Sequence, residues 1–396
     1  MFPFNVDIHL EVFPHPHMNA TGALFAIFSL LTLTGCVEII PIQAQTQAAP
    51  SAPQASGNIS RELRALLKDS KVPGVAAAVI QNGKISTGVA GIRKYKDPAL
   101  IQPNDKFHLG SCAKSMTATL AAVLVEEGRL RWDSTLAEVF QDYEIHPGFR
   151  RATLTQLLSH NAGFPSTNFA TPLWREIWAS KSDGRTLRTK LAKARMREKP
   201  RFTPGQGYIY SNAGFAVAGA MLEKVTGQTW QNLMRSKIFR PLGMSTAGFR
   251  APASKDTVDQ PWGHKSNVSP AKPFPYGDLP DAIGPAGTIH CSIGDWAKYV
   301  QYHVSGNPRP LLKSAQTLER LHQVHNSKSN YGLGWNVSSD LRHGRILTHG
   351  GTNKMWYAKV WMAPNQHCAV VVACNAGTPE ANALCAKTVA LLSRGL

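Results

Sequence analysis

The sequence predicts an α+β fold, in which helices flank an antiparallel β-sheet and an all-α domain is inserted into the sheet domain. Strand-like apolar runs occur near both ends of the chain, and helical patterns fill the middle. Because the strands at each end need partners, we expect the two ends to build one sheet. The sheet domain is therefore predicted at residues 59–114 and 286–396, and the helical domain at residues 115–285.

A β-hairpin near the N-terminus is the clearest strand signal. Two apolar runs, Gly74–Ile80 and Ile85–Gly91, are separated by Gln81-Asn-Gly-Lys84. Asn-Gly favours a tight turn, because both residues tolerate positive φ. An amphipathic helix is predicted just before the hairpin, at Ile59–Asp69.

The C-terminal part predicts further strands and a final helix. The helix is expected to begin at Pro379, after an N-cap at Thr378, and to end at Leu392, since proline is favoured in the first turn. The strand-like runs before it are Arg345–Thr348, Met355–Met362 and Cys368–Cys374.

The middle of the chain is predicted to be helical and then loop-rich. Thr153-Leu-Thr-Gln156 is a capping-box pattern that opens a short helix ending at His160. A longer apolar helix is expected at Ala213–Thr226, with Gly227 placed to end it. Ala251–Pro280 is rich in proline and is predicted to be mostly loop.

The helix predicted from Ser111 to Glu127 carries the candidate chemistry. Lys114 lies one turn after Ser111 on the same face. A neutral serine hydroxyl is a poor nucleophile and needs a base or a nearby cation to release its proton. A helix N-terminus adds backbone N–H groups where an oxyanion would form. The simpler alternative is an N-cap serine beside a solvated lysine. A second match, Ser269-Pro-Ala-Lys272, lies among prolines that exclude a helix, so we interpret it as chance.

Two further stretches favour catalysis. Tyr210 has a phenol whose pKa of about 10 makes it a poor base, but a lysine cation beside it would favour the phenolate. Asn212, two residues later, could hydrogen-bond a substrate amide. Thr348-His-Gly-Gly-Thr352 ends a predicted strand, and its glycines would let a substrate approach closely. The N–H groups of Ser111 and Thr352 are the predicted oxyanion donors.

Ser111-Cys-Ala-Lys114, then Tyr210-Ser-Asn212, then His349-Gly-Gly351, resembles the serine β-lactamase and penicillin-binding superfamily. The chain is most similar to the branch of class C β-lactamases, DD-peptidases and family VIII esterases. The resemblance covers about Val72 to Asn375 and implies the β-lactamase/transpeptidase-like fold, with the site in the cleft between the two domains. Supporting stretches are Leu157-Leu-Ser-His160, Phe202-Thr-Pro-Gly205, Pro241-Leu-Gly-Met244, Pro285-Ala-Gly287 and Tyr331-Gly-Leu-Gly-Trp335.

The resemblance also implies the roles of the site residues. Ser111 would be the acylated nucleophile, Lys114 would tune it, and Tyr210 would be the general base. Asn212 would bind substrate, together with His349, Gly350 and Gly351, which stand where relatives most often have Lys-Thr-Gly. The implied mechanism is formation of an acyl-enzyme and its hydrolysis by water, with no metal or organic cofactor.

The third motif is where this chain departs from the family pattern. His349 replaces a permanent cation with a group that is only partly charged at neutral pH, and Gly350 removes a hydroxyl. Both changes weaken recognition of an anionic β-lactam. We therefore expect a serine hydrolase of the DD-peptidase, D-aminopeptidase or esterase kind, with small-molecule or peptide substrates that include peptidoglycan-derived ones. The alternatives are a class C-like β-lactamase and a non-catalytic protein that binds cell-wall peptide or assembles with itself.

The net charge of +18 favours anionic surroundings such as lipid head groups or cell-wall polymers. The sequence has no nucleic-acid-binding motif, so we expect no nucleic-acid partner. The cysteines that follow residue 36 are odd in number and lack metal-site spacing, and any disulfide pairing stays open. They are Cys112, Cys291, Cys368, Cys374 and Cys385.

The N-terminus resembles a lipoprotein signal. Residues 1–35 contain a short apolar run, Thr21–Gly35, and Leu33-Thr-Gly-Cys36 resembles a bacterial lipobox with Cys36 as the lipidated residue. No Lys or Arg precedes Cys36, which departs from the usual signal peptide. Residues 36–58 are predicted to be a flexible tether. The expected location is the periplasmic side of a bacterial cell envelope, with a lipid anchor in a membrane.

Overall fold

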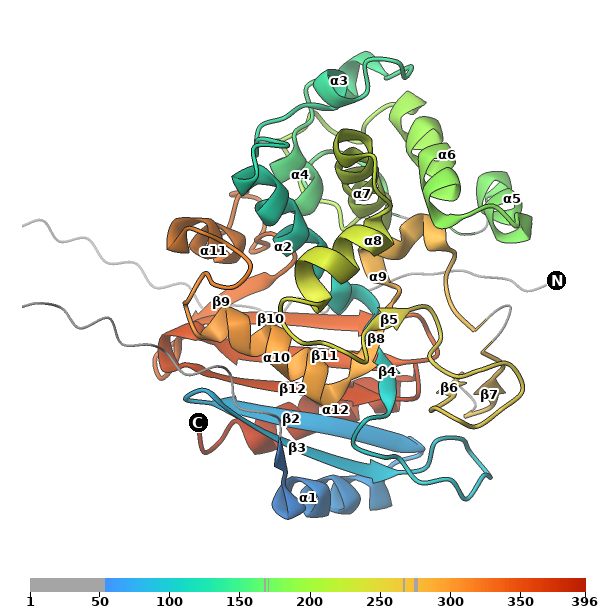
Figure 1. Cartoon of the computed structure of the whole chain (residues 1–396), viewed down its shortest axis with the longest axis vertical. Coiled ribbons are helices and arrows are strands. Elements are labelled where there is room, and N and C mark those ends of the chain that lie inside the picture. The colour runs from blue at the N-terminus through green and yellow to red at the C-terminus, as the bar shows by residue number, and fades with distance from the viewer. Residues whose placement is uncertain (1–53, 167–168, 170, 266–267, 274–276) are drawn as a thin grey trace, which may run out of the picture. The chain divides into compact units, whose positions relative to one another are not determined.

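The computed structural model describes residues 54–166, 169, 171–265, 268–273 and 277–396 (Figure 1). Its main sheet has seven strands in the order β1-β3-β2-β12-β11-β10-β9. The two ends of the chain meet where β2 pairs antiparallel with β12, in the register Val75 with Cys374 and Gln81 with Cys368. This mixed helix and antiparallel-sheet architecture confirms the predicted fold class. The strands are β1 (Gln54–Ala55), β2 (Gly74–Gln81), β3 (Lys84–Gly91), β9 (Asn336–Asp340), β10 (Gly344–Thr352), β11 (Tyr357–Ala363) and β12 (Cys368–Cys374).

The predicted hairpin is present between β2 and β3. Asn82 and Gly83 both have positive φ, 47° and 81°, which matches the right-handed twist of the strands they connect. Each strand reaches one residue closer to the turn than predicted. β2 ends at Gln81 and β3 begins at Lys84.

Alternate residues of the central strands face two different cores. Val75 and Ala77 belong to a smaller apolar cluster shared with α1 (Gly57–Lys68) and α12 (Pro379–Leu392). Ala76, between them, belongs to the larger cluster on the other face, which includes α10 (Ile293–Val304). The final helix has the predicted bounds, and the Thr378 hydroxyl accepts from the N–H of Ala381.

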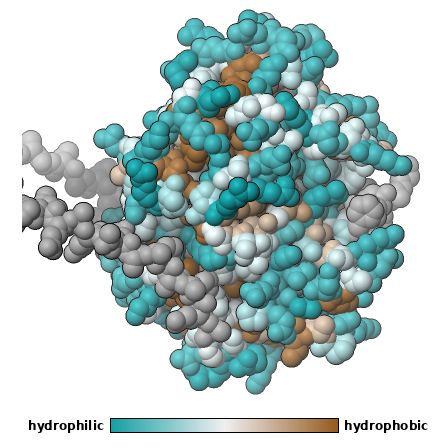
Figure 2. All heavy atoms as spheres, in the orientation of Figure 1, coloured by the Kyte–Doolittle hydropathy of each residue, from teal (hydrophilic) through white to brown (hydrophobic). Residues whose placement is uncertain are grey.

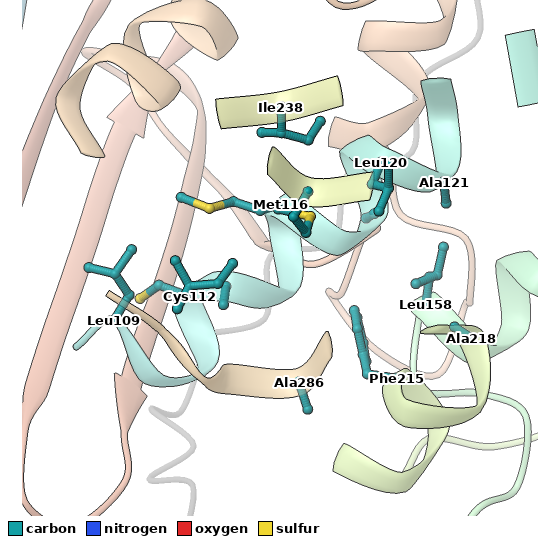
Figure 3. Close-up of a cluster of buried hydrophobic side chains, with 14 of the residues drawn as sticks. Leu109, Cys112, Met116, Leu120, Ala121, Leu158, Phe215, Ala218, Ile238 and Ala286 are labelled. Atoms are coloured by element: carbon teal, nitrogen blue, oxygen red, sulfur yellow. The ribbon is translucent and has the colours of Figure 1, made fainter. Parts of the chain in front are cut away.

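Helices lie above the sheet in Figure 1 and surround α2 (Ala113–Glu126). Every residue of α2 from Ala113 to Leu124 is buried, so this helix is enclosed on all its faces. It is a central helix because α7, α8, α9 and α11 pack around it. Figure 3 shows side chains of α2 packed against Leu158, Phe215 and Ile238. The other helices on this side of the sheet are α3 (Leu136–Val139), α4 (Leu154–Leu158), α5 (Pro172–Ala179), α6 (Gly184–Arg197), α7 (Asn212–Thr226), α8 (Trp230–Met234), α9 (Gly284–Gly287) and α11 (Ala315–His322).

Short strands were missed by the sequence analysis. β4 (Lys106–His108), β8 (Ile289–Ser292) and β5 (Gly248–Phe249) form a three-stranded sheet. β6 (Gly263–His264) pairs with β7 (Pro270–Ala271) inside the predicted loop. Runs of two to four residues are too short to show a period of two, so only their tertiary pairing reveals them.

The predicted signal segment and Cys36 lie outside the described residues. The predicted tether reaches Asn58, but Gln54–Ala55 already pairs with β3 and α1 begins at Gly57. The Ser56 side chain caps that helix by accepting from the N–H of Ile59. Regular secondary structure is therefore present before Asn58, inside the predicted tether. The division into a sheet domain and a helical domain stays a prediction.

The surface is mostly hydrophilic on the face shown in Figure 2. Within the described part of the chain, we find no helix with the length and apolar character needed to cross a membrane.

Candidate active site

Ser111 lies in a tight turn that leads into α2. Gly110–Cys112 forms a 3-10 turn, and α2 follows at Ala113, so the regular helix begins later than predicted. Gly110 has a positive φ of 51°, which favours glycine immediately before the serine. Lys114 is one turn further on, and its Nζ lies 2.9 Å from Ser111 Oγ.

The amine of Lys114 has three oxygen neighbours and is fully buried. Besides Ser111 Oγ, Nζ lies 2.7 Å from Asn212 Oδ1 and 2.8 Å from the carbonyl oxygen of Ala286. Burial holds the pKa of Lys114 well below its usual value, because removal from water disfavours the charged form. A neutral amine has two N–H groups and one lone pair. The two carbonyl oxygens can accept the two N–H groups, which leaves the lone pair directed at Ser111 Oγ.

Tyr210 reaches the same serine from the segment before α7. Its ring centre lies 4.7 Å from Lys114 Nζ. Burial raises the pKa of Tyr210, and the neighbouring Ser111 side chain offsets only part of this effect. We predicted that Lys114 would favour the phenolate. Desolvation acts in the other direction, because burial of both groups favours a neutral amine and a neutral phenol.

His160 holds the Tyr210 segment in place. Its Nδ1 accepts from the N–H of Ser211 at 3.1 Å, and its ring centre lies 4.3 Å from that of Tyr210. The residue has a positive φ of 61°, which turns the chain after α4 toward the site. Ser211 caps α7 by accepting from the N–H of Gly214, so the following helix fixes the tyrosine from the other side.

His349 lies in β10 and is buried. Its Nδ1 donates to the carbonyl oxygen of Gly350 at 2.7 Å, and its Nε2 accepts from the hydroxyl of Tyr331 at 2.8 Å. Burial, followed by the nearby Lys114, lowers the pKa of His349 to about 3. The sequence led us to expect a partly charged group at neutral pH, whereas this shift favours the neutral imidazole. The sequence predicted no role for the Tyr331 side chain in the site, since no local pattern shows that its hydroxyl contacts β10.

The glycines of the third motif let β10 approach the nucleophile turn. A Cβ atom on Gly351 would lie 2.0 Å from the carbonyl oxygen of Leu109 and 2.8 Å from the nitrogen of Ser111. A Cβ atom on Gly110 would lie 2.4 Å from the nitrogen of Thr352. The predicted oxyanion donors, Ser111 and Thr352, are thus in neighbouring, closely packed backbone segments. Substrate approach was the predicted reason for Gly350 and Gly351, but the contact between the two backbone segments already requires glycine at 351, and also at 110.

The structure brings the predicted residues together around one hydroxyl. Lys114 contacts Ser111 directly, while Asn212 and the ring of Tyr210 both lie beside the amine of Lys114. His349 lies beside Tyr210, with its ring centre 6.4 Å from that of the tyrosine. This arrangement can deprotonate a serine hydroxyl and place backbone N–H groups beside it, which is the requirement for attack on a carbonyl carbon.

Comparison with known families gives an extended match. A family model described as Beta-lactamase matches residues 59–393. The chain is 29% identical over 357 residues to unguisins hydrolase ungD of Aspergillus violaceofuscus, covering 81% of this chain and 61% of that protein. It is 26% identical to a beta-lactamase of Escherichia coli, covering 81% of this chain and 80% of that protein. The chain spans about three-fifths of the length of the first curated relatives that it matches.

Solved structures show the same fold. The octameric penicillin-binding protein homologue from Pyrococcus abyssi superimposes with a TM-score of 0.70 at 24% identity, covering 85% of this chain and 77% of that one. A D-stereospecific amidohydrolase from a Streptomyces species gives a TM-score of 0.66 at 21% identity, covering 85% and 98%.

Proposed function

Because the chain belongs to the β-lactamase family, we propose that it is a serine hydrolase that cleaves amide or ester bonds through an acyl-Ser111 intermediate. The observation that carries this proposal is the 2.9 Å contact between the buried Lys114 Nζ and Ser111 Oγ, with the ring centre of Tyr210 4.7 Å from the same amine. A protein that only binds has no need of a buried base beside a nucleophile.

The proposed acylation step uses Lys114 as the base. The proton of Ser111 Oγ moves to the lone pair of Lys114 Nζ as Oγ attacks the substrate carbonyl carbon. The N–H groups of Ser111 and Thr352 would stabilise the negative oxygen that forms. The protonated amine then donates toward Asn212 and Ala286, whose oxygens already lie within hydrogen-bond distance.

Tyr210 is proposed as the proton donor to the leaving group. Its phenol stays protonated at neutral pH because burial raises its pKa. The departing nitrogen or oxygen takes that proton, and Lys114 returns its own proton to Tyr210. Water then attacks the acyl-enzyme by the reverse sequence of transfers and releases the acid product. This assignment departs from the resemblance, which implied that Tyr210 would be the general base and that Lys114 would tune the nucleophile.

Within this activity we favour a peptidase or esterase over a β-lactamase. Many β-lactams carry a carboxylate, which a cation or a hydroxyl of the third motif would bind. Here His349 is neutral and buried, and Gly350 has no side chain. The similarity to a D-stereospecific amidohydrolase agrees with amide substrates that contain D-residues, such as peptides derived from peptidoglycan. A membrane anchor at Cys36 and a place in the bacterial cell envelope remain part of the proposal.

One labelling experiment tests the proposal. The purified chain and its Ser111→Ala variant are incubated with a fluorescent alkyl fluorophosphonate and a fluorescent penicillin. Turnover of p-nitrophenyl esters, D-Ala-D-Ala peptides and nitrocefin is then measured. We expect covalent labelling that maps to Ser111 and faster turnover of esters or peptides than of nitrocefin. Ligand binding without labelling would instead support the alternative, a non-catalytic binding protein.

A further inference from the structure

A buried aspartate outside the predicted site connects two segments of it. The side chains of Asp278 and His108 are both 0% exposed, and Asp278 Oδ2 accepts from His108 Nε2 at 2.8 Å. The other carboxylate oxygen, Oδ1, accepts from Asn353 Nδ2 at 2.9 Å and from the N–H of Leu279 at 2.7 Å. One carboxylate therefore binds β4, where His108 lies, and the residue that follows β10.

Each arm of this contact ends one residue away from a predicted oxyanion donor. His108 Nδ1 accepts from the N–H of Gly110 at 3.1 Å, and Gly110 directly precedes Ser111. Because Nδ1 accepts, the ring proton must sit on Nε2, which faces Asp278. Asn353 directly follows Thr352, so the second arm fixes the end of β10. The Asp278 carboxylate thus joins the peptide segments that carry both N–H groups.

We propose that Asp278 is a positioning residue, which acts through His108 and Asn353 to hold the N–H groups of Ser111 and Thr352 at the spacing that a tetrahedral oxyanion requires. This inference rests on the proposed serine hydrolase function. Its physical basis is that preorganised donors stabilise the oxyanion only when they are already in place, and losing one donor lowers turnover by about 10²–10³-fold. Displacing a donor should lower turnover by a smaller factor than removing it.

The variant Asp278→Asn tests the proposal with little change in volume. An amide has only one acceptor oxygen, so its NH₂ must face either the donor of His108 or the donors of Asn353 and Leu279. We expect kcat/KM for an amide substrate to fall about 10- to 100-fold, with KM changed much less than kcat. The inhibition constant of an arylboronic acid should rise in parallel, because its tetrahedral adduct on Ser111 also uses the two donors.

A rescue variant separates positioning from general damage. In Asp278→Asn with Asn353→Asp, the new amide can accept from His108 and donate to the new carboxylate, although its contact with the Leu279 N–H stays unfavourable. Partial recovery of kcat and of boronate affinity is expected. Full activity in Asp278→Asn, or a rise in KM with kcat and boronate affinity unchanged, would overturn the proposal.

A matched control is Asp295→Asn. Asp295 is also buried and accepts from the N–H and hydroxyl of Thr246, but it contacts none of the residues named in the site. It should lower the melting temperature and leave kcat below that temperature unchanged.

If wild-type protein fails to label at Ser111, the proposed function itself is wrong. If wild type labels normally and Asp278→Asn does too, only the positioning role fails.

An independent observation concerns two cysteines. Cys374 at the end of β12 and Cys385 in α12 are buried with their sulfur atoms 3.4 Å apart. We infer that they form a disulfide when the chain folds with a disulfide oxidant. The two thiols lose two protons and two electrons as the S–S bond forms, and the oxidant's disulfide is reduced to two thiols. Because both sulfurs are buried, the exchange takes place before α12 is fully packed on the sheet.

Refolding with oxidised glutathione tests this pairing. Non-reducing peptide mass spectrometry should find the peptides containing Cys374 and Cys385 linked, and Cys112, Cys291 and Cys368 alkylated after denaturation. Cys374→Ser is the matched control and should leave Cys385 free. Alkylation of both cysteines in wild type refolded with the oxidant, or a different linked pair, would overturn the inference.

Discussion

The amine of Lys114 lies 4.7 Å from the ring centre of Tyr210 while it contacts the hydroxyl of Ser111, so base, phenol and nucleophile share one desolvated space. Desolvation moves the two pKa values in opposite directions, down for Lys114 and up for Tyr210. Both groups are then neutral near neutral pH. This state is the starting point for the first two predictions.

The pH dependence of turnover should follow Lys114. The active form is the neutral amine, so kcat/KM should rise with pH through the pKa of Lys114, well below the ordinary lysine value, and then level off. Lys114→Ala should lower kcat by about 10²–10⁴-fold. Lys114→Arg should be equally impaired, because a guanidinium keeps its proton. A pH–rate profile of a D-Ala-D-Ala peptide checks this. A wild-type rate that rises only in the alkaline range of a buried tyrosine would restore Tyr210 as the base.

Removal of the Tyr210 hydroxyl should affect amides more than activated esters. A departing amine needs a proton, whereas p-nitrophenolate leaves without one. We expect Tyr210→Phe to reduce amide turnover by about 10²-fold or more and p-nitrophenyl ester acylation by less than about 10-fold. Parallel kinetics with both substrates, beside circular dichroism to verify folding, make the comparison. Equal losses on the two substrates would argue that Tyr210 acts in the attack of Ser111 rather than in departure of the leaving group.

Much of the site was predictable because its motifs are local. The Ser111–Lys114 contact follows from a spacing of one helical turn, and the Asn82–Gly83 hairpin follows from its turn residues. The protonation states were not predictable, because they depend on burial by distant segments. Likewise, no local signal reveals that Tyr331 meets His349, that Asp278 meets His108, or that β4 pairs with β8.

Substitution of Gly351 should damage the site through sterics alone. In Gly351→Ala the new methyl group would lie 2.0 Å from the Leu109 carbonyl oxygen, so β10 must move away from the nucleophile turn. We expect a loss of turnover of about 10²-fold or more, since a shift of 1 Å can have that effect.

Gly350→Ala is the matched control for this prediction. Its methyl group would lie 3.0 Å from the Tyr357 hydroxyl, a side-chain end that can shift. Initial rates of ester hydrolysis and thermal melting of both variants distinguish a local effect from unfolding. Similar losses in the two variants would show that the close backbone contact at Gly351 is not the cause.

Acid should destabilise the fold through His349. Its pKa is about 3 in the folded chain, below the ordinary value of 6.5, so between these limits the unfolded chain binds a proton that the folded chain does not. The free energy of unfolding must therefore fall as pH drops through this window, by up to about 1.4 kcal/mol per pH unit for this one group. Buried His290 and His322 add to the effect, since burial lowers their pKa values to about 4 and about 3.

Urea unfolding between pH 7 and pH 4 measures this slope. His349→Gln keeps a side chain that can hydrogen-bond Tyr331 but cannot titrate, so its stability should depend less steeply on pH than that of wild type. If His349→Gln and wild type lose stability at the same rate on acidification, then His349 is not held neutral by burial. The third motif would then still present a cation to an anionic substrate in mild acid.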